Sequence, residues 1–207
     1  FVVGLVFFFL LVRRLFKANR IALLAPAFLV VTRPYLYRTM VGFADKESLG
    51  MVFFFLALYL FLVAIQSTSF KKGVMFSFLA GFITSLMGMA WGGFQFLFLI
   101  IGLFTLYEVI FDRFDKKEFA FFVTWFLVTI LFSTTILSTR FTLLSFFISE
   151  TSLPMALAFL VGLSKYFIQA YNPWNLKHLL GKHLPSGITI SFFSTILIVL
   201  LYSIFGG

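Results

Sequence analysis

The sequence contains no cysteine and only seven acidic residues. The missing cysteine excludes a disulfide framework and a thiolate metal site. Walker A, GxGxxG, HExxH and GxSxG motifs are also missing, which argues against a nucleotide-driven or soluble hydrolytic enzyme. The few acids stand against 16 lysines and arginines, so the formal net charge is +9. A basic chain can bind nucleic acid, but here we interpret the charge as loop charge that orients a membrane protein.

Apolar residues dominate what is present. They make up 62% of the chain, which includes 34 phenylalanines and has a mean hydropathy of +1.10. No water-soluble core of this size could bury so much apolar surface, so the expected solvent is lipid. The apolar runs are long and continuous, whereas a membrane barrel shows short alternating segments. The sequence therefore predicts an all-α, polytopic helical membrane protein.

Residues 1–207 are expected to form one transmembrane domain of about eight spans, the first of them truncated. The predicted spans are 1–12, 21–32, 48–66, 74–90, 94–111, 119–138, 155–170 and 187–205. The runs 21–32 and 155–170 are short for a bilayer, so we expect them to extend into their flanks. The apolar stretch 74–111 is too long for one crossing. Paired glycines break helices, so Trp91-Gly92-Gly93 is the expected turn.

The cations alternate between two sets of loops. One set contains Arg13, Arg14, Lys17, Arg20, Lys71, Lys72, Arg113, Lys116, Lys117, Lys165, Lys177 and Lys182. The other contains Arg33, Arg38, Lys46 and Arg140. The richer set is expected to be cytoplasmic. Its acids, Glu108, Asp112, Asp115 and Glu118, alternate with cations and predict a solvated, self-neutralising loop. The remaining acids then share the extracytoplasmic face with Trp91.

Asp45-Lys46-Glu47 is the most informative motif, because two scarce acids stand one residue apart at a span boundary. Carboxylates there are costly unless they are solvated, paired or bound to a cation. Two carboxylates at this spacing can converge on a hard divalent cation such as Mg²⁺ or Mn²⁺. The alternative is helix capping, with Asp45 as the cap and Glu47 at the positive end of the helix dipole.

Other outer-face residues also carry two interpretations. Arg38 suits a phosphate or a carboxylate partner, but an interfacial arginine can simply extend to the headgroups. The Trp91-Gly92-Gly93 segment is either a close approach of backbone to ligand or a plain turn with an interfacial tryptophan. Glu150 is a candidate for the same cavity as Asp45, or for a helix cap near Pro154, or for an ion pair with Arg140.

In these residues the chain resembles the catalytic subunit of oligosaccharyltransferase, in an archaeal-like form. The segment Arg38-Thr39-Met40-x-Gly42-x-x-Asp45-x-Glu47 is similar to the second acidic motif of that family. Ala90-Trp91-Gly92-Gly93-Phe94 and Ser149-Glu150 follow in the order in which family members carry similar segments. The resemblance covers about residues 10–207 and implies part of the membrane domain of a GT-C-type glycosyltransferase.

The resemblance implies that Asp45 and Glu47 are catalytic ligands of Mn²⁺ or Mg²⁺, that Arg38 supports them, and that Trp91, Gly92 and Gly93 line the cavity for the lipid substrate. It implies a lipid-linked oligosaccharide and an acceptor polypeptide with an N-X-S/T sequon as partners. The location would be the cell membrane, or the endoplasmic reticulum membrane in a eukaryote. Arg140 and Glu150 are weaker candidates.

Two departures from the family pattern limit this interpretation. The W-W-D-Y-G motif is missing, and further acidic ligands are expected outside residues 1–207, as is the soluble acceptor-binding domain. Residues 1–207 alone are therefore expected to be inactive. Two alternatives are another lipid-phosphate-dependent glycosyltransferase, such as a protein O-mannosyltransferase, and a non-enzymatic transporter. A transporter would require polar residues at mid-membrane depth.

Overall fold

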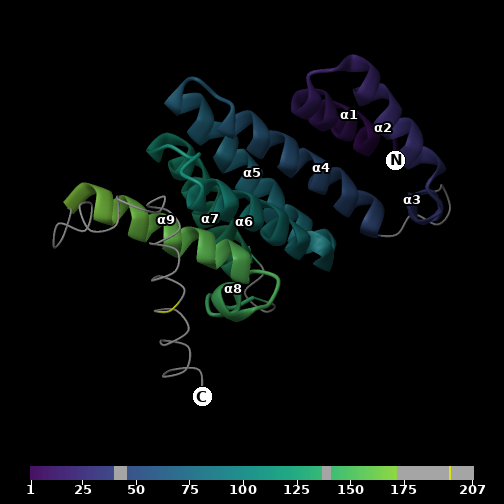
Figure 1. Cartoon of the computed structure of the whole chain (residues 1–207). Coiled ribbons are helices and arrows are strands. Elements are labelled where there is room, and N and C mark those ends of the chain that lie inside the picture. Colours follow the sequence, from purple (N-terminus) through teal and green to yellow (C-terminus); the bar gives the residue numbers. More distant parts are fainter. Residues whose placement is uncertain (40–45, 137–140, 172–195, 197–207) are drawn as a thin grey trace. The chain divides into compact units, whose positions relative to one another are not determined.

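The structure is a computed structural model that describes residues 1–39, 46–136, 141–171 and 196 (Figure 1). The described residues form helices and no strands, which confirms the all-α prediction. The helices are α1 (Val2–Phe16), α2 (Asn19–Val31), α3 (Arg33–Thr39), α4 (Lys46–Ile65), α5 (Phe70–Ala90), the short 3₁₀ helix η1 (Gly92–Phe94), α6 (Gln95–Ile110), α7 (Lys116–Ile136), α8 (Ser145–Ile148) and α9 (Leu153–Tyr171).

Four of the described helical segments are long and apolar enough to cross a membrane: Lys46–Ile65, Phe70–Ala90, Gly92–Ile110 and Lys116–Ile136. They coincide with four predicted spans and confirm an integral membrane protein. Helices α1, α2 and α9 correspond to three further predicted spans. The last predicted span, 187–205, lies outside the described residues apart from Ile196.

Helix α2 does not extend beyond its predicted C-terminal end. It stops at Val31, Thr32 is extended with φ −72° and ψ 110°, and α3 begins directly afterwards. Pro34 has no backbone N–H and could not continue the hydrogen-bond ladder of α2, but it is tolerated in the first turn of a new helix. The backbone N–H of Tyr35 instead donates to the Thr32 carbonyl. Helix α3 was not expected from the sequence.

The chain divides into two compact units, which are described separately below. Unit 1 consists of residues 1–97 and 121–143, and unit 2 consists of residues 98–120 and 144–207. In unit 1, α1 and α4 lie side by side and run in the same direction (Figure 1). Gly4 faces Val52, and the rings of Phe8 and Phe55 lie 4.7 Å apart. The order of these two contacts along both helices shows that α1 and α4 are parallel.

Helices α5 and α7 pack closely in unit 1 because α5 presents glycine to α7. A Cβ on Gly81 would lie 2.8 Å from the Trp125 carbonyl oxygen and 2.9 Å from the Val128 Cβ. Buried polar side chains also join the two helices. The Trp125 Nε1 donates to the Thr84 Oγ1 at 3.1 Å, and the Ser85 hydroxyl donates to the Thr129 carbonyl at 3.2 Å. Small residues and interhelical hydrogen bonds are the usual basis of helix association in lipid.

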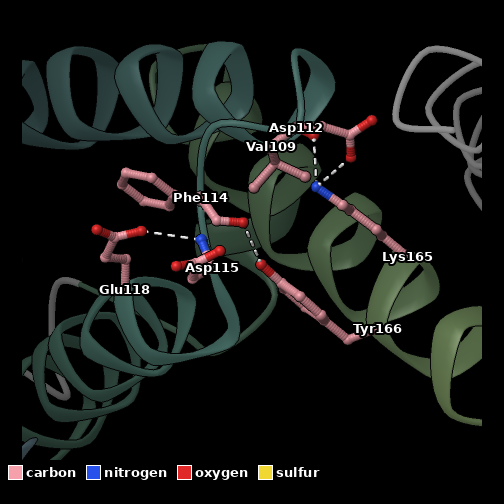
Figure 2. A network of polar contacts seen from close by, with 7 residues as sticks. All are labelled: Val109, Asp112, Phe114, Asp115, Glu118, Lys165 and Tyr166. Atoms are coloured by element: carbon pink, nitrogen blue, oxygen red, sulfur yellow. Dashed lines mark hydrogen bonds and ion pairs between the residues drawn. The ribbon is translucent and has the colours of Figure 1, made fainter. Parts of the chain in front are cut away.

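In unit 2, Lys165 is buried in α9 instead of lying in a loop (Figure 2). Its side chain is 2% exposed, and its Nζ lies 2.7 Å from the Asp112 Oδ1 and donates to the Val109 carbonyl at 3.1 Å. The next residue, Tyr166, donates its hydroxyl to the Phe114 carbonyl at 2.8 Å. Two consecutive side chains of α9 thus fasten it to the segment between α6 and α7.

The sequence predicted that the acids of this segment only neutralise neighbouring cations. In the structure they have further roles. Asp112 pairs with a lysine of another helix and adopts φ 56°, in the left-handed region, where Asp is one of the better tolerated residues. Glu118 accepts a hydrogen bond from the Asp115 backbone N–H at 2.8 Å. Asp115 directly precedes α7, so the contact is half of a capping box. These partners depend on the tertiary structure and on helix boundaries, which charge alternation does not reveal.

We expect Gly81→Ala to lower the free energy of unfolding by about 1–3 kcal/mol, because the new methyl group would push α5 away from the α7 backbone. Gly92→Ala is the matched control, since a Cβ there has no neighbour within 4 Å. Denaturant unfolding of the purified protein in detergent measures both. Equal stability of the two variants would show that α5 and α7 do not approach as closely as described.

A second prediction concerns the Lys165–Asp112 pair. Asp112→Asn should cost about 2 kcal/mol, because it leaves a buried ammonium without its counter-charge while Asp112 itself is partly solvated. The double variant Asp112→Asn/Lys165→Met should lose less than the sum of the two single losses. Glu108→Gln serves as the control, since the Glu108 side chain has no partner among the described residues. Strict additivity in the double-mutant cycle would contradict the pairing.

Candidate functional site

A pocket of about 280 Å³ lies in unit 1, where α2, α3, α4 and the residue after α5 come together. It is lined by Leu29, Thr32, Pro34, Tyr35, Glu47, Met51 and Trp91. Its lining is mainly apolar, and Glu47 is the one charged residue among the described residues that line it. An apolar cavity with few polar groups is the usual form of a small-molecule site.

The position of Glu47 follows from the start of α4. The helix begins at Lys46, so Glu47 lies in its first turn, where the positive end of the helix dipole favours a carboxylate. The side chain is half-buried and reaches the pocket. The placement thus agrees both with a stabilised helix start and with a role in the pocket. Asp45, directly before the helix, lies outside the described residues, so its metal-binding and capping roles both stay predictions.

Trp91 enters the pocket from the break between α5 and α6. Helix α5 ends at Ala90, and Trp91 is extended, with φ −151° and ψ 134°. Its backbone N–H still donates to the Met87 carbonyl at 2.7 Å. Gly92–Phe94 form a 3₁₀ turn before α6 begins. The predicted helix break is therefore present, and it directs an indole into the same cavity as Glu47.

Two glycines make room for the Trp91 indole. A Cβ on Gly93 would lie 2.4 Å from two ring atoms of Trp91, and a Cβ on Gly50 would lie 2.9 Å from the Trp91 Cβ. A Cβ on Gly92 would meet nothing within 4 Å. Gly93 is therefore required for space, while Gly92 is not. Sequence reasoning missed Gly50, although a glycine one turn after Glu47 in an otherwise bulky apolar helix is a signal of close approach.

Tyr35 was also missed by sequence reasoning. It is 7% exposed, and its hydroxyl lies 3.0 Å from where a Cβ on Gly4 would stand. Burial raises the pKa of the Tyr35 phenol above its ordinary value, so the group stays neutral near pH 7. Tyr35 therefore lines the pocket as a neutral aromatic residue. The sequence feature that could have indicated Tyr35 is Thr32-Arg33-Pro34, where helix α3 starts and takes its direction.

The other predicted site residues are not brought to this pocket by the described structure. Arg38 belongs to α3, one turn after Tyr35, but its side chain is not among those described. Arg140 lies outside the described residues. Glu150 is exposed in the turn before α9, in unit 2. Of the predicted candidates, the structure thus unites Glu47 with Trp91, and with Gly93, which packs under the indole.

The donor chemistry suits a hard divalent cation in part. Among the described residues there is no group of three or more His, Cys, Asp and Glu side chains that could hold a metal ion. Glu47 supplies one carboxylate, and Asp45, two residues earlier, is the nearest further acid in the sequence. Oxygen ligands are those that Mg²⁺ and Mn²⁺ prefer. A complete metal centre would require ligands in addition to Glu47.

Comparison with known proteins gives one match. The model of the family described as oligosaccharyl transferase STT3, N-terminal, matches residues 1–204. A search of curated proteins finds no matching relative. The family match therefore covers the pocket, the Asp45-Lys46-Glu47 motif and all the described helices.

The two glycines after Trp91 allow a matched test of the indole position. We expect Gly93→Ala to displace the ring from the pocket and Gly92→Ala to leave it in place. With Trp125 and Trp174 replaced by Phe, Trp91 is the one remaining tryptophan and can be excited selectively at about 295 nm, which avoids tyrosine. Acrylamide quenching of its fluorescence should then increase in the Gly93 variant only. Identical quenching in both variants would contradict the packing of Gly93 against the ring.

Proposed function

Because the chain belongs to the oligosaccharyl transferase STT3 family, we propose that it transfers an oligosaccharide from a lipid-linked phosphate or pyrophosphate carrier to an asparagine of an acceptor protein. The family match and the apolar helices support a glycosyltransferase located in a membrane. The N-X-S/T sequon, the metal and the residue roles are parts of the proposal. The observation that supports them most is that Glu47 and Trp91 line one pocket.

In this reaction the asparagine amide nitrogen attacks the anomeric carbon of the first sugar. A carbon–nitrogen bond forms, the bond from that carbon to the lipid phosphate oxygen breaks, and the phosphate leaves with the electron pair. The nitrogen loses a proton, which the departing phosphate or water accepts. A bound divalent cation would supply positive charge for the departing phosphate. A carboxylate alone beside a phosphate would be repulsive, so an acidic pocket of this kind requires such a cation.

The residues of this chain would bind and orient the substrates. The carboxylates of Asp45 and Glu47 would hold Mn²⁺ or Mg²⁺, and the Glu47 oxygens can also accept a hydrogen bond from the acceptor amide. Arg38, on the helix that carries Tyr35, would support the acids or the phosphate. Trp91, Gly92 and Gly93 would form the wall toward the lipid substrate. The mainly apolar lining would lower the local dielectric constant, which strengthens electrostatic interactions in the pocket.

The site is proposed to open on the extracytoplasmic face, since the pocket lies at the end of α4 that carries few cations. The family match favours this function over a transporter or a protein O-mannosyltransferase. Glu150 and Arg140 are left out of the proposed site, because nothing described brings either to the pocket. Further ligands are proposed to come from outside residues 1–207.

The proposal is tested in the full-length protein with Asp45→Ala and Glu47→Gln. Each should reduce metal-dependent transfer by about 100-fold or more, because each removes a group that acts on charge developing in the transition state. The assay measures glycosylation of a fluorescent N-X-S/T peptide from a lipid-linked oligosaccharide, with and without chelator. Glu108→Gln, an acid outside the pocket, should remain active.

Two outcomes would decide against the proposal. Full activity of Asp45→Ala would exclude its role as a metal ligand. Modification of a Ser/Thr peptide without asparagine, in place of the sequon peptide, would identify an O-glycosyltransferase instead. Circular dichroism and size-exclusion profiles of the variants separate a catalytic loss from a failure to fold.

A further inference from the structure

Unit 1 collects six cations at the end opposite to the Glu47 pocket. Because α1 and α4 run in the same direction, their C-terminal ends lie at one end of the unit (Figure 1). That end carries the turn between α1 and α2 and the turn between α4 and α5. We call it the basic end, and define it by Arg13, Arg14, Lys17, Arg20, Lys71 and Lys72.

The charges of the basic end are not neutralised within the described part of the chain. No side chain among these six makes an ion pair, hydrogen bond or ring contact with the residues that the structure describes. Glu47, the acid of the pocket, starts the 20-residue helix α4, whose far end reaches the basic end. A helix of that length spans about 30 Å, well beyond a Debye length in physiological salt.

Unit 2 shows the opposite arrangement around the turn between α6 and α7. There Lys165 pairs with Asp112, and the Arg113 guanidinium lies 5.3 Å from the centre of the Tyr107 ring (Figure 2 shows the lysine pair). Acids alternate with the cations of that turn. The two basic turns therefore differ in a way that charge counting along the chain does not show. Lys165 and Arg113 have partners within unit 2, whereas none of the six cations of the basic end has one among the described residues.

Arg14 gives the basic end an unmet hydrogen-bonding requirement. The residue is half-buried in the last turn of α1, and its Nε is buried with no acceptor among the described residues. The carbonyl of Arg13 is already used by the Lys17 backbone N–H, at 2.9 Å. A buried guanidinium donor without an acceptor is costly, and an anionic oxygen is the acceptor that satisfies it best.

Apolar side chains beside these cations identify the kind of anion. Leu15 is 53% exposed, Phe16 is 61% exposed and Ile21 is 45% exposed. A surface that combines cations with exposed apolar side chains matches a molecule with a phosphate next to hydrocarbon. A soluble anion or a nucleic acid would not contact these apolar side chains, whereas the acyl chains of a phospholipid would.

We propose that the turn between α1 and α2 binds the phosphate headgroup of an anionic phospholipid in the leaflet opposite to the Glu47 pocket. Arg14 and Lys17 contact the phosphate, Arg13, Arg20 and the two lysines of the next turn add long-range attraction, and the exposed apolar side chains pack against the acyl chains. This site is separate from the proposed catalytic pocket and does not depend on its metal or substrates.

The test uses the full-length protein in nanodiscs of phosphatidylcholine with phosphatidylglycerol. After transfer to detergent, native mass spectrometry counts the phosphatidylglycerol molecules retained. Arg14→Gln/Lys17→Gln should weaken retention by about 25-fold, from about fivefold for each cation. The matched control is Lys116→Gln/Lys117→Gln, which also removes one exposed and one half-buried cation and should leave retention unchanged.

Retention in the Arg14/Lys17 variant equal to that of the unaltered protein would overturn the proposal, as would an equal loss in the control. Competition by millimolar inorganic phosphate would identify a soluble-anion site instead. If the double variant does not fold, Lys17→Gln alone, at an exposed position, should still lower retention about fivefold. Transfer activity is assayed in parallel, so that failure of the catalytic proposal and failure of lipid binding are distinguished.

Discussion

The lack of hydrogen-bond partners in lipid governs the rest of this structure. Backbone groups in hydrocarbon must bond within their own segment, so the apolar runs have to become helices. Many polar side chains inside the spans obey the same constraint, although the Ser77 and Thr105 hydroxyls are buried with no partner among the described residues. Thr84 donates to the Ala80 carbonyl and accepts from Trp125, and Ser133 donates to Ser85. In unit 2, Lys165 is buried only together with a carboxylate and a carbonyl. Polar groups in this protein thus mark where helices must meet.

Close approach of backbone serves two different purposes here. Apolar side chains gain little by leaving lipid for one another, so helices associate through shape and through small residues. Gly81 lets α5 approach α7, and Gly102 leaves no room for a Cβ beside the Met155 backbone. The pocket uses the same device, with Gly50 and Gly93 placed against the Trp91 indole. The small residues that allow helices to pack in a membrane thus also allow the Trp91 indole to lie next to Glu47.

The sequence was sufficient for features that depend on local pattern. Apolar run length predicted the all-α class and the four long spans, and the paired glycines predicted the break after Ala90. The resemblance in residues 38–47 agreed with the family that matches. Sequence reasoning missed Tyr35, Gly50 and the Lys165–Asp112 pair, because each acquires its meaning from a partner distant in sequence. A buried lysine cannot be distinguished from a loop lysine by charge alone. The roles of Asp45, Arg38 and Arg140 remain predictions.

The contact between Gly50 and Trp91 links two parts of the pocket mechanically. Glu47 and Gly50 lie within one turn of α4, and the indole rests on that turn while belonging to the break between α5 and α6. A ligand that moves the indole must therefore also move the first turn of α4 and its carboxylate. Occupancy of the apolar wall and the affinity of the charged group are then coupled, and such coupling is reciprocal. A ligand bound against Trp91 would thus change the affinity at Glu47, and a ligand bound at Glu47 would change the affinity at Trp91 by the same factor.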